Sequence, residues 1–286
     1  MLSTPSSGWR VPYLGQSVPL PGRYDSWRPY TYPRDDIQSP SQTAETVSAS
    51  NQLRPRTITG IARIDSFITN HTQGFQPSTL TLLDGQTDFL FLLVAQIIVK
   101  AVQNFDRDVV FVDGGNSFDV YAVTACCRRF KLDPEQVLKR VKIARAFTVY
   151  QLDTLLTRDL ERSVQELRPK LVIGACISNL FLDKDVDWTE SKVIMANDFR
   201  ALQKLAVDHE LVMLLTKYGH QRSMHRFELN SILRSNLSPS NIIGLKPASR
   251  RKLRFITGTG RIMDYYPLPP YQLSLDEFCD GGDIYR

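Results

Sequence analysis

A glycine that follows a short apolar run is the first position in this sequence that could bind phosphate. Residues 79–83 predict a strand, Gly85 follows, and the next residues have helical character. Phosphate-binding loops of the G-x-x-x-x-G-K-[S/T] type have this order, and their lysine and hydroxyl hold phosphate and metal. Here Leu90, Phe91 and Leu92 occupy the positions of Gly, Lys and Ser/Thr. Because they supply no cation, we expect ATP binding to be weak or absent.

A basic and aromatic stretch at positions 216–228 is a candidate contact for nucleic acid. Its cations Lys217, Arg222 and Arg226 suit phosphate oxygens, and Tyr218 suits stacking on a base. The alternative is a solvated surface loop with no ligand.

A second basic stretch, PASRRKLRF, occupies positions 247–255. Alternate residues of a strand share one face, so Arg250, Lys252 and Arg254 would form a ridge that faces phosphates. The alternative is an edge strand whose charges protect it from aggregation.

Charge and composition permit nucleic-acid contact without requiring it. The chain has 286 residues, a formal net charge of +5 and a pI near 9.0, and 42% of its residues are hydrophobic. Its four cysteines and four histidines show no zinc spacing, so we predict neither a metal site nor a cofactor. No signal segment is visible, and the most apolar run, residues 89–99, is too short for a bilayer. We expect a soluble, intracellular protein.

The first 56 residues differ from the rest of the chain. They hold eight of the sixteen prolines and also several tryptophans and tyrosines, without apolar periodicity. Proline at this density prevents regular structure, so we predict a disordered tail over residues 1–56. Its aromatic residues favour a segment that folds onto a partner, and a tail that packs on its own domain, or does nothing, is an equal alternative.

Segments with strand and helix character alternate over residues 57–286. Short apolar runs predict strands at residues 79–83, 141–147 and 210–216, a buried parallel strand that ends in a turn at 108–115, and a buried strand with its exit at 170–181. Helices are predicted at residues 89–105, 118–130, 152–167 and 191–209, and another begins at Pro134 after Asp133 as its N-cap. A hairpin is predicted at residues 251–266 around a Gly-Thr-Gly turn. The pattern predicts one α/β domain with a mainly parallel sheet, helices on both faces and a C-terminal β-hairpin.

Taken in order, these segments resemble the ATPase core of RecA-type recombinases of the archaeal and eukaryotic branch, with its paralogs. The least generic match is LDPEQVLKRVKIARAFTVYQLDTLL, and weaker ones are TGIARIDSFI, VVFVDGGNSF, KLVIGACISNLF and a terminal F-x-x-x-D-G signature. The likeness covers residues 58–283 and implies a RecA-like fold. It also implies that the segment after the strand at 210–216 faces DNA.

The departures from that family each concern a separate requirement of phosphoryl transfer. By the resemblance, the lysine and hydroxyl of the phosphate loop fall at Phe91 and Leu92, and the glutamate that activates water falls at Gly115. The Walker B aspartate falls at Ala175, and the pair that senses the γ-phosphate falls at Lys217 and Tyr218. Loss of charge, metal, water activation and sensing together predicts a pseudo-ATPase that is not an enzyme.

The resemblance therefore implies a non-catalytic recombinase paralog, similar to the RecA-fold subunits of the fungal Shu complex. Such a chain would pair with another RecA-fold paralog in a heterodimer or larger complex, and with the recombinase. Through that complex it would contact single-stranded or forked DNA and promote recombinase filaments on single-stranded DNA, in homologous-recombination repair in the nucleus. The rival is a divergent RecA-type DNA-dependent ATPase with a composite or displaced site, in which Lys100 or Lys217 supplies the charge. A third alternative is an α/β adaptor unrelated to recombination.

Overall fold

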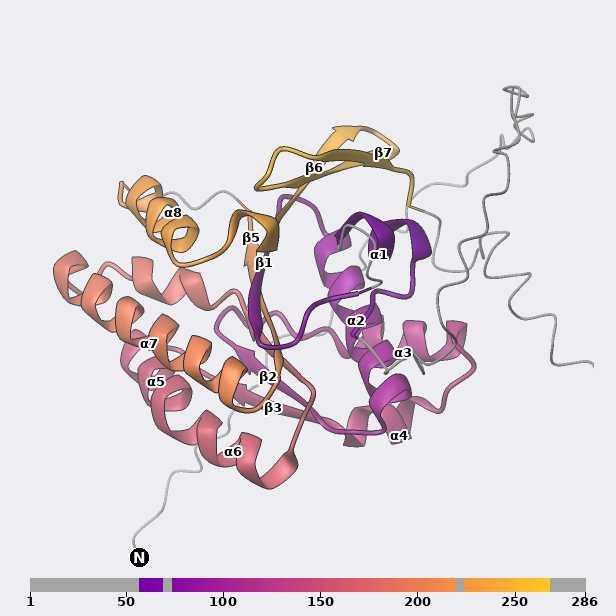
Figure 1. Cartoon of the computed structure of the whole chain (residues 1–286), viewed down its shortest axis with the longest axis horizontal. Coiled ribbons are helices and arrows are strands. Elements are labelled where there is room, and N and C mark those ends of the chain that lie inside the picture. The colour runs from indigo at the N-terminus through magenta and orange to yellow at the C-terminus, as the bar shows by residue number, and fades with distance from the viewer. Residues whose placement is uncertain (1–56, 69–73, 220–223, 268–286) are drawn as a thin grey trace, which may run out of the picture. The chain divides into compact units, whose positions relative to one another are not determined.

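A single eight-stranded sheet organises the computed structural model, which describes residues 57–68, 74–219 and 224–267 (Figure 1). The strand order is β3-β2-β4-β5-β1-β6-β7-β8. The strands from β3 to β6 are all parallel to one another, whereas β7 pairs antiparallel with both β6 and β8. The strands are β1 (Thr79–Gly85), β2 (Val109–Asp113), β3 (Val141–Arg145), β4 (Leu171–Ala175), β5 (Val212–Tyr218), β6 (Ile242–Ser249), β7 (Lys252–Thr257) and β8 (Ile262–Tyr265). This order brings the carboxyl ends of β1, β2, β4 and β5 to one edge, where open α/β sheets bind ligands.

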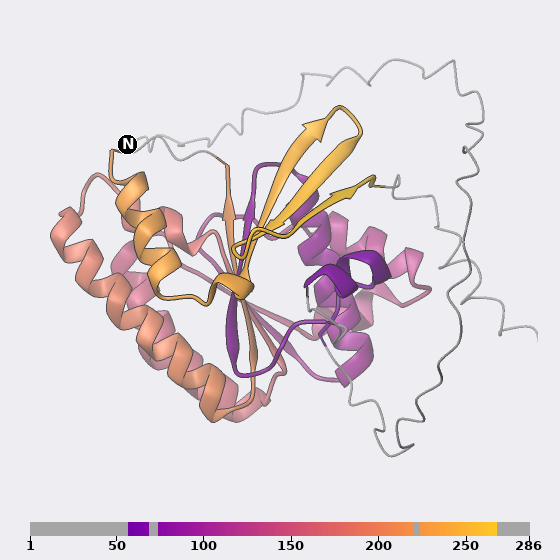
Figure 2. The same cartoon turned by 45° about the horizontal axis from the view of Figure 1, so that its top comes forward.

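Helices cover both faces of the sheet (Figure 2). One apolar cluster joins the sheet to α1–α4, and a second joins its other face to α5–α8. The helices are α1 (Ala62–Ile68), α2 (Phe89–Phe105), α3 (Val120–Arg129), α4 (Pro134–Lys139), α5 (Val149–Thr154), α6 (Leu160–Leu167), α7 (Trp188–Asp208) and α8 (Arg226–Ser235). Short helical segments lie at Leu155–Asp159, Ile177–Leu182 and Pro239–Asn241. The fold is the α/β, RecA-like arrangement that the sequence predicts.

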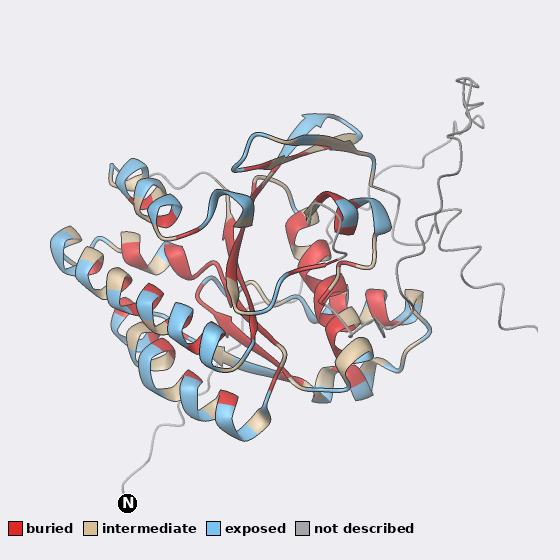
Figure 3. Cartoon of the chain, in the orientation of Figure 1, coloured by how far each residue is buried: buried red, intermediate tan, exposed pale blue. Residues whose placement is uncertain are grey.

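The innermost elements are those with unbroken apolar sequence. Every residue of β2 and β4 is buried, as expected for strands covered on both sides, and α2 buries ten of its side chains (Figure 3). Helix α4 begins where the sequence predicts, because the Asp133 side chain accepts the backbone N–H of Glu135 and Pro134 occupies the first turn.

The helix predicted over residues 152–167 contains one wide turn. A π-helical segment, Leu155–Asp159, lies between α5 and α6. Its buried side chains Leu152, Leu156, Leu160 and Val164 recur strictly every four residues. In a regular α-helix such a spacing drifts by about 40° at each step, so a wider turn keeps these side chains facing the sheet.

Most predicted elements are confirmed, but α1, α8 and β6 were not predicted, and the basic segments differ from the prediction. The predicted loop at 216–228 is wrong in part, because β5 continues through Tyr218 and α8 begins at Arg226. Arg250 lies in the turn between β6 and β7, so only Lys252 and Arg254 follow the predicted alternation. The predicted tail, residues 1–56, and the F-x-x-x-D-G signature lie outside the described residues. Within the described ranges, no helix is long and apolar enough to cross a membrane.

Candidate nucleic-acid interface and closed phosphate loop

The loop between β1 and α2 is short and closed. Strand β1 ends at Gly85 and α2 begins at Phe89, so residues 86–88 alone connect them. The backbone N–H of Gln86 donates to the carbonyl of Leu245 on β6 at 2.9 Å. A phosphate cradle needs backbone N–H groups that point at the ligand, and this one is already bonded within the sheet.

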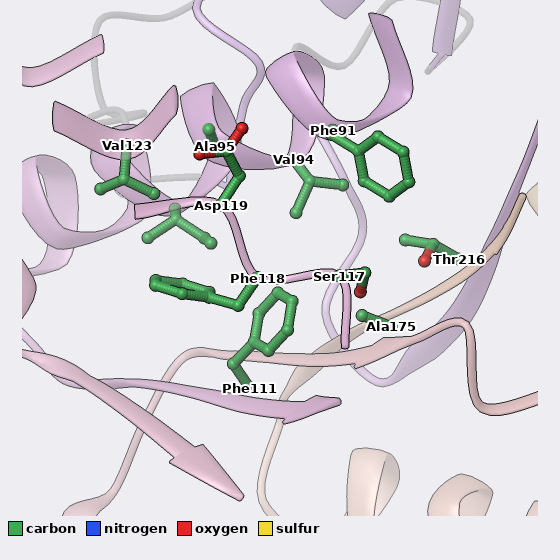
Figure 4. A pocket seen from close by; sticks show the side chains of 11 residues that line it. Phe91, Val94, Ala95, Phe111, Ser117, Phe118, Asp119, Val123, Ala175 and Thr216 are labelled. Atoms are coloured by element: carbon green, nitrogen blue, oxygen red, sulfur yellow. The ribbon is translucent and has the colours of Figure 1, made fainter. Parts of the chain in front are cut away.

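Apolar side chains fill the space beside this loop (Figure 4). Leu90 is fully buried against Gly85, where an added Cβ would lie 2.8 Å from a Leu90 methyl carbon. The centre of the Phe91 ring lies 4.7 Å from the centre of the Tyr218 ring. A residual cavity of about 10 Å³ remains, large enough for about one water molecule. Its lining comprises Phe91, Val94, Ala95, Ile98, Phe111, Ser117, Phe118, Asp119, Val123, Ala175 and Thr216, which include no cation.

Two carboxylates flank the loop. The ammonium of Lys217 lies 3.2 and 3.3 Å from the two carboxylate oxygens of Asp84, which faces it across β1 and β5. The hydroxyl of Tyr218 donates to Asp88, and this bond raises the pKa of Tyr218 above its ordinary value. Asp88 would repel a phosphate at the loop, and Asp84 neutralises the nearest lysine.

A buried aspartate, not predicted from the sequence, organises the turn after β2. Asp113 accepts the backbone N–H groups of Gly115, Ser117 and Phe118, and it lies 3.3 Å from Arg145 Nε. Burial raises the pKa of Asp113, but these hydrogen bonds outweigh burial and hold the pKa below its ordinary value. The signal in the sequence was the Asp-Gly-Gly that ends a buried strand.

No room exists for a side chain at Gly115, where the resemblance places the catalytic glutamate. A Cβ added there would lie 2.6 Å from the Cβ of Cys176. Cys176 is fixed because its backbone N–H donates to both the carbonyl and the hydroxyl of Thr216. Ala175, at the Walker B position, is buried at the end of β4 and lines the small cavity.

The two lysines that could replace the missing charge are poorly placed to do so. Lys100 lies eleven residues beyond Phe89, about 16 Å along α2, and its ammonium lies over the ring of Phe130 and bonds Gln103. Lys217 is close to the loop but 7% exposed and paired with Asp84.

The predicted DNA-contact residues lie on two neighbouring surfaces. Arg226 is the first residue of α8, whereas Lys217 and Tyr218 end β5. Lys252 and Arg254 share one face of β7 and both bind Asp264 of β8, with nitrogen–oxygen distances of 2.6 and 2.8 Å. Arg254 and Lys252 hold the pKa of Asp264 well below its usual range, so a carboxylate partly offsets this ridge. Arg222 lies outside the described residues.

A groove between α8 and the β6–β7 sheet is lined by cations that the sequence did not predict to be neighbours. Its volume is about 540 Å³, and its cations are Lys217, Arg226, Arg234 and Lys246, with Asp84 as its carboxylate. Arg234 and Lys246 were missed because α8 and β6 were not predicted. The signal for α8 was the four-residue spacing of its buried residues Leu229 and Leu233.

The sequence of this chain also matches a known protein family. The sequence model of the Rad51 family matches residues 85–271, which run from the closed loop through the hairpin. The chain belongs to the Rad51 family. It is a RecA-type recombinase paralog, and its role is accordingly a recombinase-related one in recombination, with RecA-fold complexes and DNA as the associated interactions. Membership of the Rad51 family also removes the alternative of an unrelated α/β adaptor.

Proposed function

We propose that this Rad51-family chain is a non-catalytic recombinase paralog. It pairs with another RecA-fold paralog and promotes assembly of the recombinase filament on single-stranded DNA, in homologous-recombination repair in the nucleus. This role is similar to that of the RecA-fold subunits of the Shu complex.

The closed phosphate loop is the observation that carries this proposal. Hydrolysis of ATP requires a cradle for phosphate, a cation, a metal ligand and a group that positions water. At the corresponding places this chain has a bonded N–H at Gln86, the ring of Phe91, a buried Ala175 and a Gly115 without space for a side chain. A rearrangement that created all four would disrupt the packing between α2, β4 and β5.

Purified chain is expected to show no magnesium-dependent ATP turnover. Its melting temperature should also be unchanged by excess magnesium-ATP, because a ligand stabilises only a state that binds it. The measurements are phosphate release, with and without single-stranded DNA, and a thermal melt. Turnover that disappears in Lys217→Ala or Lys100→Ala would establish the rival ATPase instead.

The β3 edge is the surface best suited to a RecA-fold partner. It is the outer strand at one end of the described sheet, and an unpaired edge offers backbone groups to another chain. Ile143, Phe147 and Tyr150, on or just after β3, are 43%, 69% and 51% exposed. Exposed apolar groups beside an open strand edge are typical of a protein interface.

Phe147→Asp is expected to lower recovery of the partner about tenfold or more, as loss of an aromatic anchor does. The tagged chain would be purified from its own cells and the accompanying proteins identified by mass spectrometry. Val207→Asp is the matched control, because Val207 is also apolar and 59% exposed but lies on α7. Absence of any RecA-fold protein with the folded parent chain would overturn the pairing proposal, and exclusion of the tagged chain from nuclei would overturn the localisation.

A further inference from the structure

The groove between α8 and the β6–β7 sheet has more positive charge than the fold itself requires. Arg226, Arg234 and Lys246 line it from two different elements, and they form no ion pair with any described residue. Lys217 at its floor is the one lining cation that Asp84 neutralises. Three cations that converge on one groove, with no ion-pair partner in the described part of the chain, repel one another, so a bound anion would stabilise them.

The spacing of these cations favours an extended anion over a single phosphate. Arg226 and Arg234 are eight residues apart on α8, which separates them by about 12 Å along the helix. Lys246 lies on the opposite wall, and Arg254 is its cross-strand neighbour on β7. Cations therefore lie on both walls, from α8 to β6, and beyond them the ridge carries Arg254, whose charge Asp264 partly offsets.

The rest of the lining suits a nucleic-acid strand. Four glycines, Gly219, Gly244, Gly258 and Gly260, also line the groove, and a Cβ added at Gly219 or Gly260 would meet no atom within 4 Å, so a ligand has room to approach there. Phe227 is 70% exposed and also lines it, and the Arg226 guanidinium lies 4.6 Å from the centre of its ring. An exposed aromatic ring among arginines is a typical platform for an unpaired base.

The wall formed by α8 is held in place from the other side. The indole N–H of Trp188, at the start of α7, donates to the Glu228 carboxylate at 2.7 Å, and the Trp188 ring stacks on His225 at 4.7 Å. The ammonium of Lys192 lies 3.7 Å from the same carboxylate. These contacts fix the first turn of α8, so Arg226 and Phe227 are presented on an anchored element.

We infer that this groove binds the phosphate backbone of a single nucleic-acid strand, with Arg226, Arg234 and Lys246 on phosphates and Phe227 against a base. The inference rests on the proposed function, and it names the surface that contacts the DNA. It keeps Arg226 from the first basic stretch and adds Arg234, Lys246 and Phe227, whereas the second stretch adjoins the groove only through Arg254, the cross-strand neighbour of Lys246.

The test is binding of a fluorescent oligo-dT strand to the full chain, as purified with any partner that accompanies it. Arg234→Ala with Lys246→Ala is expected to weaken binding about tenfold and to make the slope of log affinity against log salt shallower by about 1.4, because two phosphate contacts are lost. Arg200→Ala with Lys204→Ala, which removes two exposed cations of α7, is the matched control and should leave both values near those of the parent chain.

Phe227→Ala separates stacking from charge. It should weaken binding about tenfold with the salt slope unchanged, because stacking on a base releases no counterions. Equal effects of the groove pair and the control pair, or no binding of oligo-dT by the parent, would overturn the inference. Displacement of the strand by equimolar pyrophosphate or ATP would also overturn it, since the groove would then be a site for a small anion. None of these outcomes bears on whether a RecA-fold partner co-purifies.

Discussion

The Asp198→Asn variant is expected to be more stable than the parent chain at and above neutral pH, and equally stable near pH 4. Asp198 lies on α7 with none of its surface exposed, and neither carboxyl oxygen has a hydrogen bond of good geometry within the described residues. Burial, together with the nearby carboxylate of Asp153 on α5, raises the pKa of this carboxyl to about 8.

The direction of the effect follows from proton binding in the two states. Between its ordinary pKa of 3.8 and about 8, the Asp198 carboxyl is protonated in the folded chain and ionised in the unfolded chain. The folded state therefore binds one more proton, and the free energy of unfolding decreases as pH rises through this range. The loss amounts to about 1.4 kcal/mol per pH unit, or on the order of 4 kcal/mol by pH 7. Asparagine has no charge to bury, and its amide can donate to Asp153.

Thermal melts of the parent chain and Asp198→Asn across this pH range measure the effect directly. The informative quantity is the difference between the two curves, because other titrating groups cancel in it. Asp185→Asn serves as the control, since Asp185 is exposed in the loop before α7 and should leave the profile of the parent unchanged. A difference that stays flat from pH 4 to pH 8 would show that the Asp198 carboxyl titrates normally.

Gly115→Ala is expected to destabilise the chain by about 1–3 kcal/mol, as overpacking of a close contact does. The added methyl group would lie 2.6 Å from the Cβ of Cys176, and the backbone of Cys176 is held by two hydrogen bonds to Thr216. Cys176 cannot move without disturbing the junction of β4 and β5, and the Gly115 backbone is held by the bond from its N–H to Asp113. The same contact excludes the larger glutamate that the recombinase resemblance places at this position.

A double-mutant cycle with Cys176→Gly tests whether that contact is the cause. Cys176 has a φ of +52°, a conformation that glycine adopts without strain, so its removal by this route should cost little. In the double variant, the loss of unfolding free energy caused by Gly115→Ala should be less than half of its value in the single variant. Chemical denaturation of the four proteins should then give a coupling free energy of about 1–2 kcal/mol. Additive effects of the two substitutions would show that the methyl group is accommodated elsewhere.

The sequence predicts the interior of this fold better than its surface. Helix α2 and strands β2 and β4 follow from apolar runs whose lengths favour a helix and strands respectively, and they lie within the predicted ranges. Strand β6 contains Gly244 and Pro247, and its pairing with β1 involves residues about one hundred and sixty positions apart, which no local pattern reveals.

The candidate site shows the same division. The closed loop could be predicted because the apolar side chains of Leu90 and Phe91 offer phosphate neither a cation nor a hydroxyl in any surroundings. The state of Lys217 could not, because its partner Asp84 lies 133 residues away and meets it only through the register of β1 and β5. Likewise, the groove takes its cations from β5, α8 and β6, so its charge emerges only when the chain is folded.

Under the proposed function, the three-residue loop after β1 would separate this chain from the nucleotide cycle of neighbouring Rad51-family subunits. A ligand shifts a conformational equilibrium only by its differential affinity for two states. ATP therefore cannot change the conformational equilibrium of a chain that does not bind it. Within a mixed assembly of Rad51-family subunits, such a chain would keep one conformation while adjacent subunits bind and hydrolyse ATP. It would then act as a constant end of a filament, present from nucleation onward, whose release must be triggered by its protein or DNA contacts.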